Sequence, residues 1–291
     1  MSTIAVAIAS LGRPESLGEV LMCLKSQSRH ADRIVLSVTS EADLPADFND
    51  PDVEIIMGSK GASTQRNRAL DHLGSSVDYV IFYDDDYVPS RFAIENLISF
   101  FDQNPDIVGA MGNTFKDGIG GPGYSFAKAS RMVQEKDSEP APTPEIYKDV
   151  SGLYGCNMAF RNEAIGTVRF DENLPMYSWL EDNDFSNQLL GRGRLVHTNA
   201  FWGVHCGIKK ARSPGLRLGY SQIANPIYLS RKGTLPWPKA LHLMSRNFLA
   251  NHAKTLAPEP WVDRWGRAKG NWLAIRHIFS GKLDPTHITN L

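Results

Sequence analysis

The sequence predicts an α/β protein, built as a mostly parallel sheet flanked by helices and followed by a helical C-terminal extension. Three observations predict this class. Strand-like and helix-like patterns alternate from residue 1 to about residue 112, which is typical of parallel strands joined by covering helices. The apolar run 80–83 has the composition of a buried strand and ends directly in three aspartates. Beyond Pro214 the pattern is helical, with prolines between the segments.

Each element of the alternating region follows from a local pattern. Runs rich in β-branched and apolar residues predict strands, and apolar residues three or four apart predict helices. The predicted strands cover 3–9, 33–38, 53–56, 77–83 and 107–112, and the predicted helices cover 14–26, 63–73 and 92–101. Open sheets of this kind bind ligands at the carboxyl ends of their strands, which is where the aspartates stand.

The chain changes character between residues 113 and 150. Glycines crowd between 118 and 123, and prolines between 140 and 144. This composition predicts a long, partly mobile excursion of the kind that forms lids and binding loops. Regular patterns return at 152–161, followed by a strand at 167–170, a helix at 180–190, a strand at 194–197 and helices at 216–231, 239–256 and 261–279.

The overall composition narrows the class of function. A net charge of -1 over 291 residues gives the chain no general attraction to nucleic acid. The three cysteines are widely spaced, so we expect free thiols in a reducing cytoplasm. The first residues show no signal-peptide pattern, and no apolar stretch is long enough to span a membrane. We therefore expect a cytoplasmic protein, with at most peripheral membrane contact.

The aspartates at 84–86 are the first candidate for a site. In extended backbone Asp84 and Asp86 share one face, whereas Asp85 points back. Two hard oxygen ligands on one face suit Mg²⁺ or Mn²⁺ carrying a phosphorylated substrate. The alternative is a polar turn in which an aspartate caps a helix that begins near Ser90. Taken alone, the triplet leaves both interpretations open.

Residues 61–68 are the second candidate, because they begin a predicted helix. Gly61 and its small neighbours let backbone N–H groups approach an anion, and a helix N-terminus favours negative charge. Arg66 and Arg68 cannot share a helical face, so one can point toward the carboxylates or a diphosphate while the other reaches solvent. The alternative is an ordinary serine-capped helix with solvated arginines.

Glu181 and Asp182 are the third candidate. They open the helix predicted at 180–190 and stand beside Tyr177 and Trp179. A carboxylate in an aromatic-walled pocket can act as a general base. The alternative is structural, because the helix dipole favours acidic residues in any first turn.

Two further segments carry weaker signals. Tyr154, Gly155 and Asn157 suit the wall of a sugar pocket, but they suit a tight turn into a buried strand equally well. His205 could be a nitrogen ligand to the same metal, a partner for phosphate or a structural histidine. Zinc held by this histidine and two of the cysteines is a further alternative, although no Cys-x-x-Cys spacing supports it.

In this order the segments resemble the family-2 glycosyltransferases, whose catalytic domain has the Rossmann-like GT-A fold. The resemblance covers about residues 1–210, and its matching segments are 9–14, 61–67, 82–86, 155–161 and 181–182. The helical tail, with 219–220, 225–228 and 232–233, is similar to that of bacterial polysaccharide-assembly members of the family.

The resemblance implies a role for each matching residue. Asp86 would ligate a metal directly, with Asp84 near the metal's waters or the ribose and His205 at the metal or the diphosphate. Asp182 would be the catalytic base, and Glu181 would face the acceptor. The implied nucleotide contacts are Ala9, Ser10, Arg13, Glu41, Lys60, Gly61, Arg66, Asp84 and Asp85. The implied acceptor and donor-sugar pocket is Tyr154, Gly155, Asn157 and Trp179.

One departure from the family leaves the nucleotide open. Family members usually carry an acid after the second strand that helps to hold the base, and here that place reads Ser-Val-Thr-Ser-Glu over 37–41. Either the usual acid is absent, or Glu41 takes its place. A UDP-sugar donor is favoured but not fixed.

The resemblance implies an inverting transferase that uses Mn²⁺ or Mg²⁺. It would move a sugar from a nucleotide diphosphate sugar to a hydroxyl of a saccharide or lipid-linked saccharide, in bacterial surface or exopolysaccharide synthesis. The implied domains are a catalytic domain at 1–210, with a nucleotide-binding part at about 1–112 and an acceptor-binding part at about 150–210, and a helical extension at 211–291. A sugar-nucleotide nucleotidyltransferase and a non-catalytic binding protein are the alternatives.

The C-terminal helices interleave basic residues with tryptophans. Such helices could rest on a bilayer where a lipid-linked acceptor sits. They could equally pack their tryptophans onto the catalytic domain.

Overall fold

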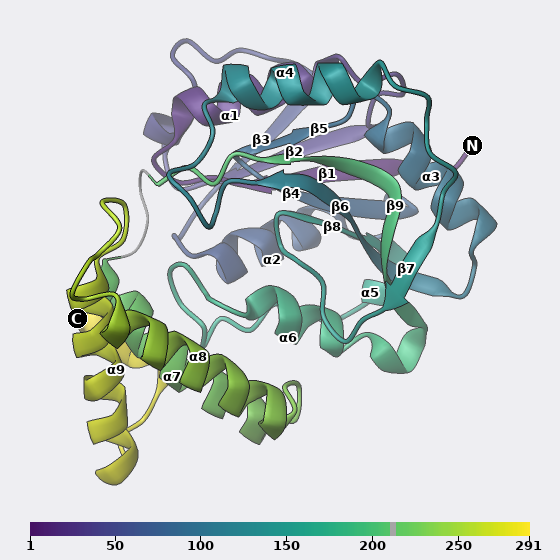
Figure 1. The fold of residues 1–291 in the computed structure, drawn as a ribbon. Helices are drawn as coiled ribbons and strands as arrows, with labels where there is room; N and C mark the ends of the chain where they lie inside the picture. Colours follow the sequence, from purple (N-terminus) through teal and green to yellow (C-terminus); the bar gives the residue numbers. More distant parts are fainter. Residues whose placement is uncertain (210–213) are drawn as a thin grey trace. The chain divides into compact units, whose positions relative to one another are not determined.

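The computed structural model describes residues 1–209 and 214–291 and divides into two compact units (Figure 1). The first unit holds Met1–Lys60, Gln65–Arg169 and the described part of Leu189–Ala211. The second holds Gly61–Thr64, Phe170–Gln188 and the described part of Arg212–Leu291. The domain boundary expected between 210 and 211 lies outside the described residues. Residues 170–188, which the sequence places in the catalytic part, belong to the second unit.

The first unit is built on one sheet, which in the described residues has nine strands in the order β3-β2-β1-β4-β8-β6-β9-β5, with β7 paired to β9. The strands are β1 (Ile4–Ala9), β2 (Arg33–Val38), β3 (Val53–Met57), β4 (Tyr79–Asp84), β5 (Tyr87–Pro89), β6 (Ile107–Asp117), β7 (Ile146–Asp149), β8 (Asn157–Arg161) and β9 (Arg194–His205). Strands β1–β4 pair in parallel, as do β6 and β9. Strands β5, β7 and β8 run antiparallel to their neighbours. The predicted fold class, a mostly parallel sheet flanked by helices, is confirmed.

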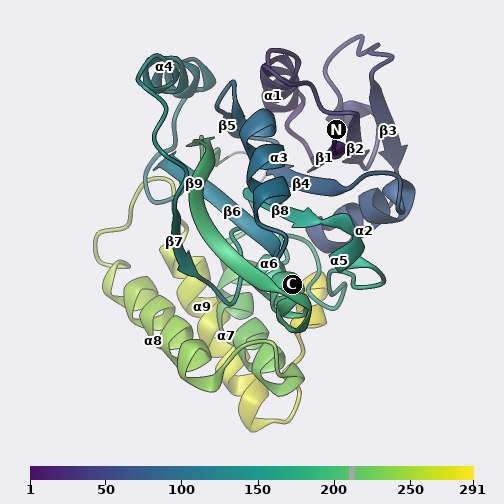
Figure 2. The same ribbon diagram turned by 90° about the vertical axis from the view of Figure 1, so that its right-hand side faces the viewer.

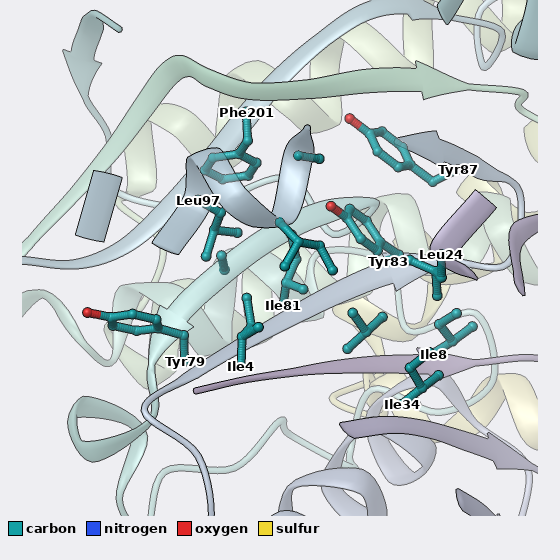
Figure 3. Close-up of a cluster of buried hydrophobic side chains, with 14 of the residues drawn as sticks. Ile4, Ile8, Leu24, Ile34, Tyr79, Ile81, Tyr83, Tyr87, Leu97 and Phe201 are labelled. Carbon is teal, nitrogen blue, oxygen red and sulfur yellow. The ribbon is translucent and has the colours of Figure 1, made fainter. Parts of the chain in front are cut away.

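Helices cover both faces of this sheet. The apolar sides of α1 (Pro14–Lys25) and α3 (Ala93–Gln103) pack in one core with alternate residues of β1, such as Ile4 and Ile8, and of β4, such as Ile81 and Tyr83 (Figure 3). Helix α2 (Ala62–Leu73) lies on the opposite face (Figure 1). Because β4 is covered on both faces, its sequence is continuously apolar rather than alternating.

The segment 113–150 is not the long excursion that its composition predicts. Strand β6 continues to Asp117, helix α4 (Phe126–Asp137) packs on β5 and β9, and β7 adds to the sheet. The glycines at 118–123 and the prolines at 140–144 mark two separate loops around that helix. The composition predicts one loop because the helix between the two clusters is mostly polar and buries only Ala129 and Val133.

Two strand predictions in the second half need correction. Residues 167–170 form no strand; the chain turns after α5 (Asn162–Ile165), and the Phe170 ring stacks on Phe185, with ring centroids 3.9 Å apart. The strand predicted at 194–197 extends to His205 as β9 and curves along β6 (Figure 2). His205 is thus the last residue of a strand and does not follow one.

The second unit is mainly helical. It contains α6 (Glu181–Asn187), α7 (Gly215–Lys232), α8 (Trp237–Ala253), α9 (Arg264–Phe279) and a terminal 3-10 helix (Pro285–Asn290). Helices α7 and α9 approach so closely that a Cβ on Gly219 would lie 2.1 Å from the Arg267 carbonyl oxygen, and one on Gly270 would lie 2.1 Å from that of Leu216. Among the described residues, no helix is long and apolar enough to cross a membrane.

Candidate functional site

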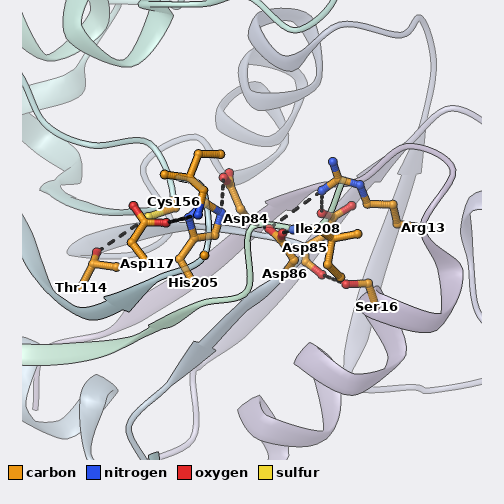
Figure 4. Close-up of polar contacts among 12 residues, drawn as sticks. Arg13, Ser16, Asp84, Asp85, Asp86, Thr114, Asp117, Cys156, His205 and Ile208 are labelled. Atoms are coloured by element: carbon orange, nitrogen blue, oxygen red, sulfur yellow. Dashed lines mark hydrogen bonds and ion pairs between the residues drawn. The ribbon is translucent and has the colours of Figure 1, made fainter. Parts of the chain in front are cut away.

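Three side chains in the first unit converge where strands end. Asp84 is the last residue of β4, Asp86 lies in the turn to β5, and His205 is the last residue of β9. One ligand atom from each lies within 4.8 Å of the others, which makes this the cluster of the described residues that could hold a metal ion. Figure 4 shows these side chains beside the strand ends. The triplet does not cap α3, since β5 comes between them.

The two cysteines considered as zinc ligands are not part of this cluster. Cys156 is buried, and its thiol lies 3.9 Å from the Thr114 hydroxyl. Burial, together with nearby carboxylates, raises the pKa values of Cys156 and Cys206 above the ordinary thiol value. Neither thiol belongs to the group of described side chains that could hold a metal, so the structure gives the zinc alternative no support.

Asp86 is almost fully buried and is held as an anion. Its carboxylate accepts a hydrogen bond of 2.7 Å from the backbone N–H of Ile208 and lies 3.4 Å from His205 Nε2. Burial alone would raise its pKa, but His205, the guanidinium of Arg13 and the Ile208 N–H outweigh burial and lower it. A buried carboxylate that remains charged is well suited to ligate a cation.

Asp85 points away from this pair, as the alternation of an extended chain predicts. Its carboxylate accepts hydrogen bonds from the Ser10 hydroxyl at 2.6 Å and from Arg13 Nη1 at 2.8 Å. The Ser16 hydroxyl donates to its backbone carbonyl. Burial raises the pKa of Asp85 to about 6, even though Arg13 lowers it. Asp85 therefore ties the turn after β4 to the loop after β1, where Ser10 and Arg13 were expected near a nucleotide.

Arg66 and Arg68 of α2 point in different directions, as expected. The prediction that one faces the carboxylates is confirmed for Arg66, but the prediction that the other reaches solvent does not hold for Arg68. Arg66 is buried and its Nη2 lies 3.1 Å from Asp84 Oδ1, so it faces the carboxylates. Arg68 does not simply reach solvent. It donates to the Ser37 hydroxyl and to the backbone carbonyls of Val38 and Ser59, and so fastens the end of β2 to the loop before α2.

Sequence reasoning missed the residue that holds His205. Asp117, the last residue of β6, pairs in register with His205, and its Oδ1 lies 2.8 Å from Nδ1 of the imidazole. The Tyr154 hydroxyl lies 3.1 Å from Asp117 and 3.3 Å from the same ring nitrogen. With Nδ1 engaged, Nε2 faces Asp86 and Asp84. A carboxylate behind a histidine is the usual way in which a metal-ligating imidazole is oriented.

The electrostatics of His205 follow from this enclosure. Burial lowers its pKa, but the hydrogen bonds and charges of Asp117, Asp86 and Asp84 outweigh burial and raise the pKa to about 10. In the absence of a cation the imidazole is therefore protonated at neutral pH. It then serves as the positive partner of the carboxylates around it.

Two acids, Glu41 and Asp43, follow β2, and their environments differ. Glu41 is exposed, whereas Asp43 is buried and accepts hydrogen bonds from the backbone N–H groups of Gly12 at 2.7 Å and Thr39 at 2.8 Å. Burial opposes ionisation, but these bonds outweigh it and lower the pKa of Asp43. Asp43 thus links the loops after β1 and β2.

Four further residues of the first unit that the sequence assigned to the site differ in burial and surroundings. Asn157 is buried in the sheet and its amide donates to the Tyr87 hydroxyl at 2.6 Å, so it stands among core residues. Gly155 is buried next to Cys156, and Lys60 is exposed. Ala9, at the end of β1, is paired with Ser37 and Asp84 on the neighbouring strands.

The predicted base belongs to the second unit. Asp182 lies in the first turn of α6 and is partly exposed, with Glu181 buried beside it. The fully buried carboxylate of this helix is Asp184, which accepts from Lys232 Nζ at 2.7 Å and from the Thr234 hydroxyl at 2.5 Å. This pairing fixes α6 to the end of α7 and its loop.

The backbone that leads into α6 is strained. Met176, Ser178 and Leu180 all have positive φ angles, of 62°, 51° and 77°. Each such residue costs on the order of 1–3 kcal/mol, and strain of this kind persists where surrounding contacts hold it. Among these contacts, Asn225 Nδ2 donates to the Trp179 carbonyl and the Ala62 N–H to that of Met176. Strained backbone directly before Glu181 and Asp182 is typical of a functional site.

Comparison with known proteins identifies the family of this chain and structures with a similar fold. The sequence pattern of "Glycosyl transferase family 2" matches residues 6–169, more than half of the chain. A search of curated proteins gave no match. The residues matched include β1 from Val6 onward, all of β2–β4 and the aspartate triplet.

Solved structures of several glycosyltransferases have a similar fold. TarS 1-349 of S. aureus has a TM-score of 0.51 at 12% identity, over 98% of this chain and 89% of that one. The mannosyltransferase PcManGT of Pyrobaculum calidifontis has a TM-score of 0.51 at 16% identity, over 99% of this chain and 85% of that one. GalNAc-T7 has a TM-score of 0.52 at 14% identity, over 97% of this chain and 59% of that one. The present chain spans 40% of the length of a longer TarS chain. At these identities the likeness establishes the GT-A fold. With the family pattern matched over 6–169, the chain belongs to glycosyl transferase family 2.

Proposed function

We propose that this glycosyltransferase is inverting and metal-dependent. It moves a sugar from a nucleotide diphosphate sugar to a hydroxyl of a saccharide or lipid-linked saccharide, in the cytoplasm, for bacterial surface polysaccharide. The observation that carries the proposal is the cluster of Asp84, Asp86 and His205, with Arg66 and Arg13 beside it. The neighbours support the donor class, since PcManGT was solved with GDP-Man and Mn²⁺, GalNAc-T7 with UDP, GalNAc and Mn²⁺, and TarS 1-349 with UDP-GlcNAc.

The donor set fits a divalent cation. Two carboxylates and one imidazole supply hard oxygen ligands and a nitrogen, which suits Mn²⁺ and also admits Mg²⁺. When bound, the ion would neutralise negative charge on the diphosphate leaving group. Arg66 and Arg13 place further positive charge at the same strand ends. In this proposal the nucleotide lies along the loops that carry Ala9, Ser10, Glu41, Lys60 and Gly61.

The chemical step is assigned to the second unit. The Asp182 carboxylate takes the proton of the acceptor hydroxyl, and the freed oxygen forms a bond to the anomeric carbon. The bond from that carbon to the nucleotide diphosphate breaks on the opposite side, so the configuration inverts. Glu181 and Trp179 are the proposed contacts with acceptor and donor sugar in the second unit, and Tyr154, Gly155 and Asn157 are those in the first unit.

Replacement of the proposed base separates chemistry from binding. We expect Asp182→Asn to lower transfer by about 10²–10⁴-fold, the usual contribution of a general base. Nucleotide affinity, measured by calorimetry with UDP, should stay within about twofold, because the variant keeps the shape and neutralises only the base. Asp184→Asn is the matched control, and it should lower the melting temperature, since its carboxylate is buried against Lys232. Transfer by Asp182→Asn at the wild-type rate would refute the assignment.

Metal dependence and donor class can be tested together. Metal-free protein should hydrolyse no nucleotide sugar from a panel of UDP, GDP and other donors, and Mn²⁺ or Mg²⁺ should restore hydrolysis of one of them. Full activity without metal would remove the role of Asp84 and Asp86. Release of pyrophosphate from a sugar phosphate and a nucleoside triphosphate would instead identify a nucleotidyltransferase. Binding of UDP without turnover of any donor would identify a non-catalytic protein.

A further inference from the structure

Helix α9 presents a continuous stripe of aromatic and basic side chains. Trp265, Lys269, Trp272, Arg276 and Phe279 recur at intervals of three and four residues, so they lie on one side of the helix. Their aromatic members are exposed, at 60% for Trp265, 57% for Trp272 and 87% for Phe279. Singly exposed apolar residues are common on protein surfaces, but a row of three aromatic rings is not.

The aromatic and basic stripe faces away from α7, because the opposite side of α9 is packed against that helix. Gly266, Gly270 and Ala274 face inward, and the two glycines lie so close to α7 or its first residues that no side chain fits. Close packing thus fixes the rotation of α9 about its axis. Trp265, Trp272 and Phe279 are held outward as a consequence.

Helix α8 extends the same surface. Leu241 is 58% exposed and Leu249 is 66% exposed, whereas Ala240 and Asn251 of the same helix are buried. The two helices adjoin at Trp272, whose ring lies against Phe248, with centroids 5.5 Å apart, and against His252. We call the exposed residues of both helices the α8–α9 face: Trp237, Leu241, Arg246, Leu249, Trp265, Lys269, Trp272, Arg276 and Phe279.

This region is strongly basic, in contrast to the chain as a whole. Residues 237–282 contain eight Lys or Arg and two Asp or Glu, a formal charge of +6, whereas the whole chain has -1. Both acids are engaged locally. Glu259 pairs with Lys254 and Arg264, and Asp263 caps the start of α9 by accepting from the Gly266 N–H. The cations of the α8–α9 face therefore have no carboxylate among them.

We propose that the α8–α9 face docks on an anionic lipid surface, lying in the plane of the headgroups. Tryptophan and phenylalanine insert at the boundary between headgroups and acyl chains, and Lys and Arg interleaved with them pair with lipid phosphates. A second copy of the chain is a poorer occupant. A two-fold contact would place this positive face on itself, and Lys269 and Arg276 would lose water in the centre of the interface.

The proposal does not depend on which sugar is moved, and it can fail or succeed apart from the transferase function. It gives the helical extension a task of its own. If the acceptor is lipid-linked, the same contact would raise the local concentration of acceptor around the enzyme.

The test is flotation of the full-length protein with phosphatidylcholine vesicles that contain or lack 30% phosphatidylglycerol. We expect binding to the anionic vesicles, weaker binding at high salt and little binding to neutral ones. Trp265→Gln/Phe279→Gln and Lys269→Glu/Arg276→Glu should each weaken binding at least about tenfold, given roughly 1 kcal/mol for each basic residue at such a surface. Brominated lipids should quench the tryptophan fluorescence of wild type more than that of the first variant.

Matched controls use exposed residues of the first unit. Met22→Gln/Leu190→Gln removes two exposed apolar side chains, and Arg131→Glu/Lys148→Glu reverses two exposed charges. Both should float like wild type, and all four variants should keep the wild-type melting temperature and UDP affinity. Absence of wild-type flotation, or equal loss in the controls, would overturn the proposal. So would a dimer in sedimentation that the α9 variants dissociate while no vesicle binding is seen.

Discussion

At the scale of residues, the aspartate triplet is three differently held carboxylates. Asp84 is paired with Arg66, Asp85 with Arg13 and Asp86 with His205. Adjacent carboxylates repel one another, so each needs its own cation. The three carboxylates therefore have different roles. Asp85 holds the loop after β1, whereas Asp84 and Asp86 lie with His205 at the proposed metal site.

The raised pKa of His205 couples metal binding to pH. With a pKa of about 10 the imidazole carries a proton at pH 7, but only neutral imidazole can ligate a metal. Binding must therefore release about one proton. We expect the apparent Mn²⁺ affinity to rise about tenfold for each pH unit between pH 6.5 and 8.5, as measured by calorimetry in buffers of different ionisation enthalpy.

Two variants check that His205 is the source of this proton. His205→Asn should bind Mn²⁺ more weakly and lose the pH slope. Tyr154→Phe keeps both His205 and Asp117 and should retain it. A wild-type affinity that does not change over this pH range would show that the imidazole stays outside the metal's coordination.

At the scale of elements, the sequence predicts those strands and helices that are specified by a local pattern of apolar residues. Strands β1–β4 and helices α1–α3 lie within a few residues of their predicted ends, because each is specified by its own apolar periodicity. Helical periodicity shows that Arg66 and Arg68 face different ways, and the family resemblance points to Arg66 as the one near the site. Asp117 could not be placed from the sequence, because the ends of β6 and β9 depend on each other, and His205 is placed only through the family resemblance. Residues 113–117 become a strand only by pairing with 202–205, across irregular register.

The α7–α9 contact is specified by glycine and gives an element-scale prediction. A methyl group on Gly219 would lie 2.1 Å from the Arg267 carbonyl oxygen, which is backbone and cannot move aside alone. We expect Gly219→Ala to destabilise the second unit by about 1–3 kcal/mol, the usual cost of overpacking, in urea unfolding followed by tryptophan fluorescence. The gain in helix propensity from alanine is at most about 1 kcal/mol and does not compensate.

Gly191→Ala is the matched control, because nothing lies within 4 Å of its added methyl. It should leave the free energy of unfolding within about 0.5 kcal/mol of wild type. If Gly219→Ala were as stable as wild type, the close approach of α7 and α9 would be wrong.

At the scale of the whole molecule, the two units carry different parts of the proposed reaction. The proposed metal ligands lie in the first unit, whereas Glu181 and Asp182 lie in the second. Each unit also has apolar cores of its own. A ligand that binds only one folded unit stabilises that unit alone, unless the units unfold together.

Mn²⁺ should therefore stabilise the first unit selectively. At 100 times its Kd it adds about 2.7 kcal/mol, which corresponds to roughly 5–10 °C in the melting temperature of a domain of this size. Five of the six tryptophans lie in the second unit, and Trp202→Phe removes the other, so fluorescence of this variant follows the second unit alone. We expect Mn²⁺ to shift a circular dichroism transition of that variant while its fluorescence transition stays within about 1 °C. Asp86→Asn should abolish the first shift, because it removes a proposed ligand without touching the second unit. If both probes shifted together by the same amount, the two units would unfold as one cooperative block, and the metal would stabilise the entire chain.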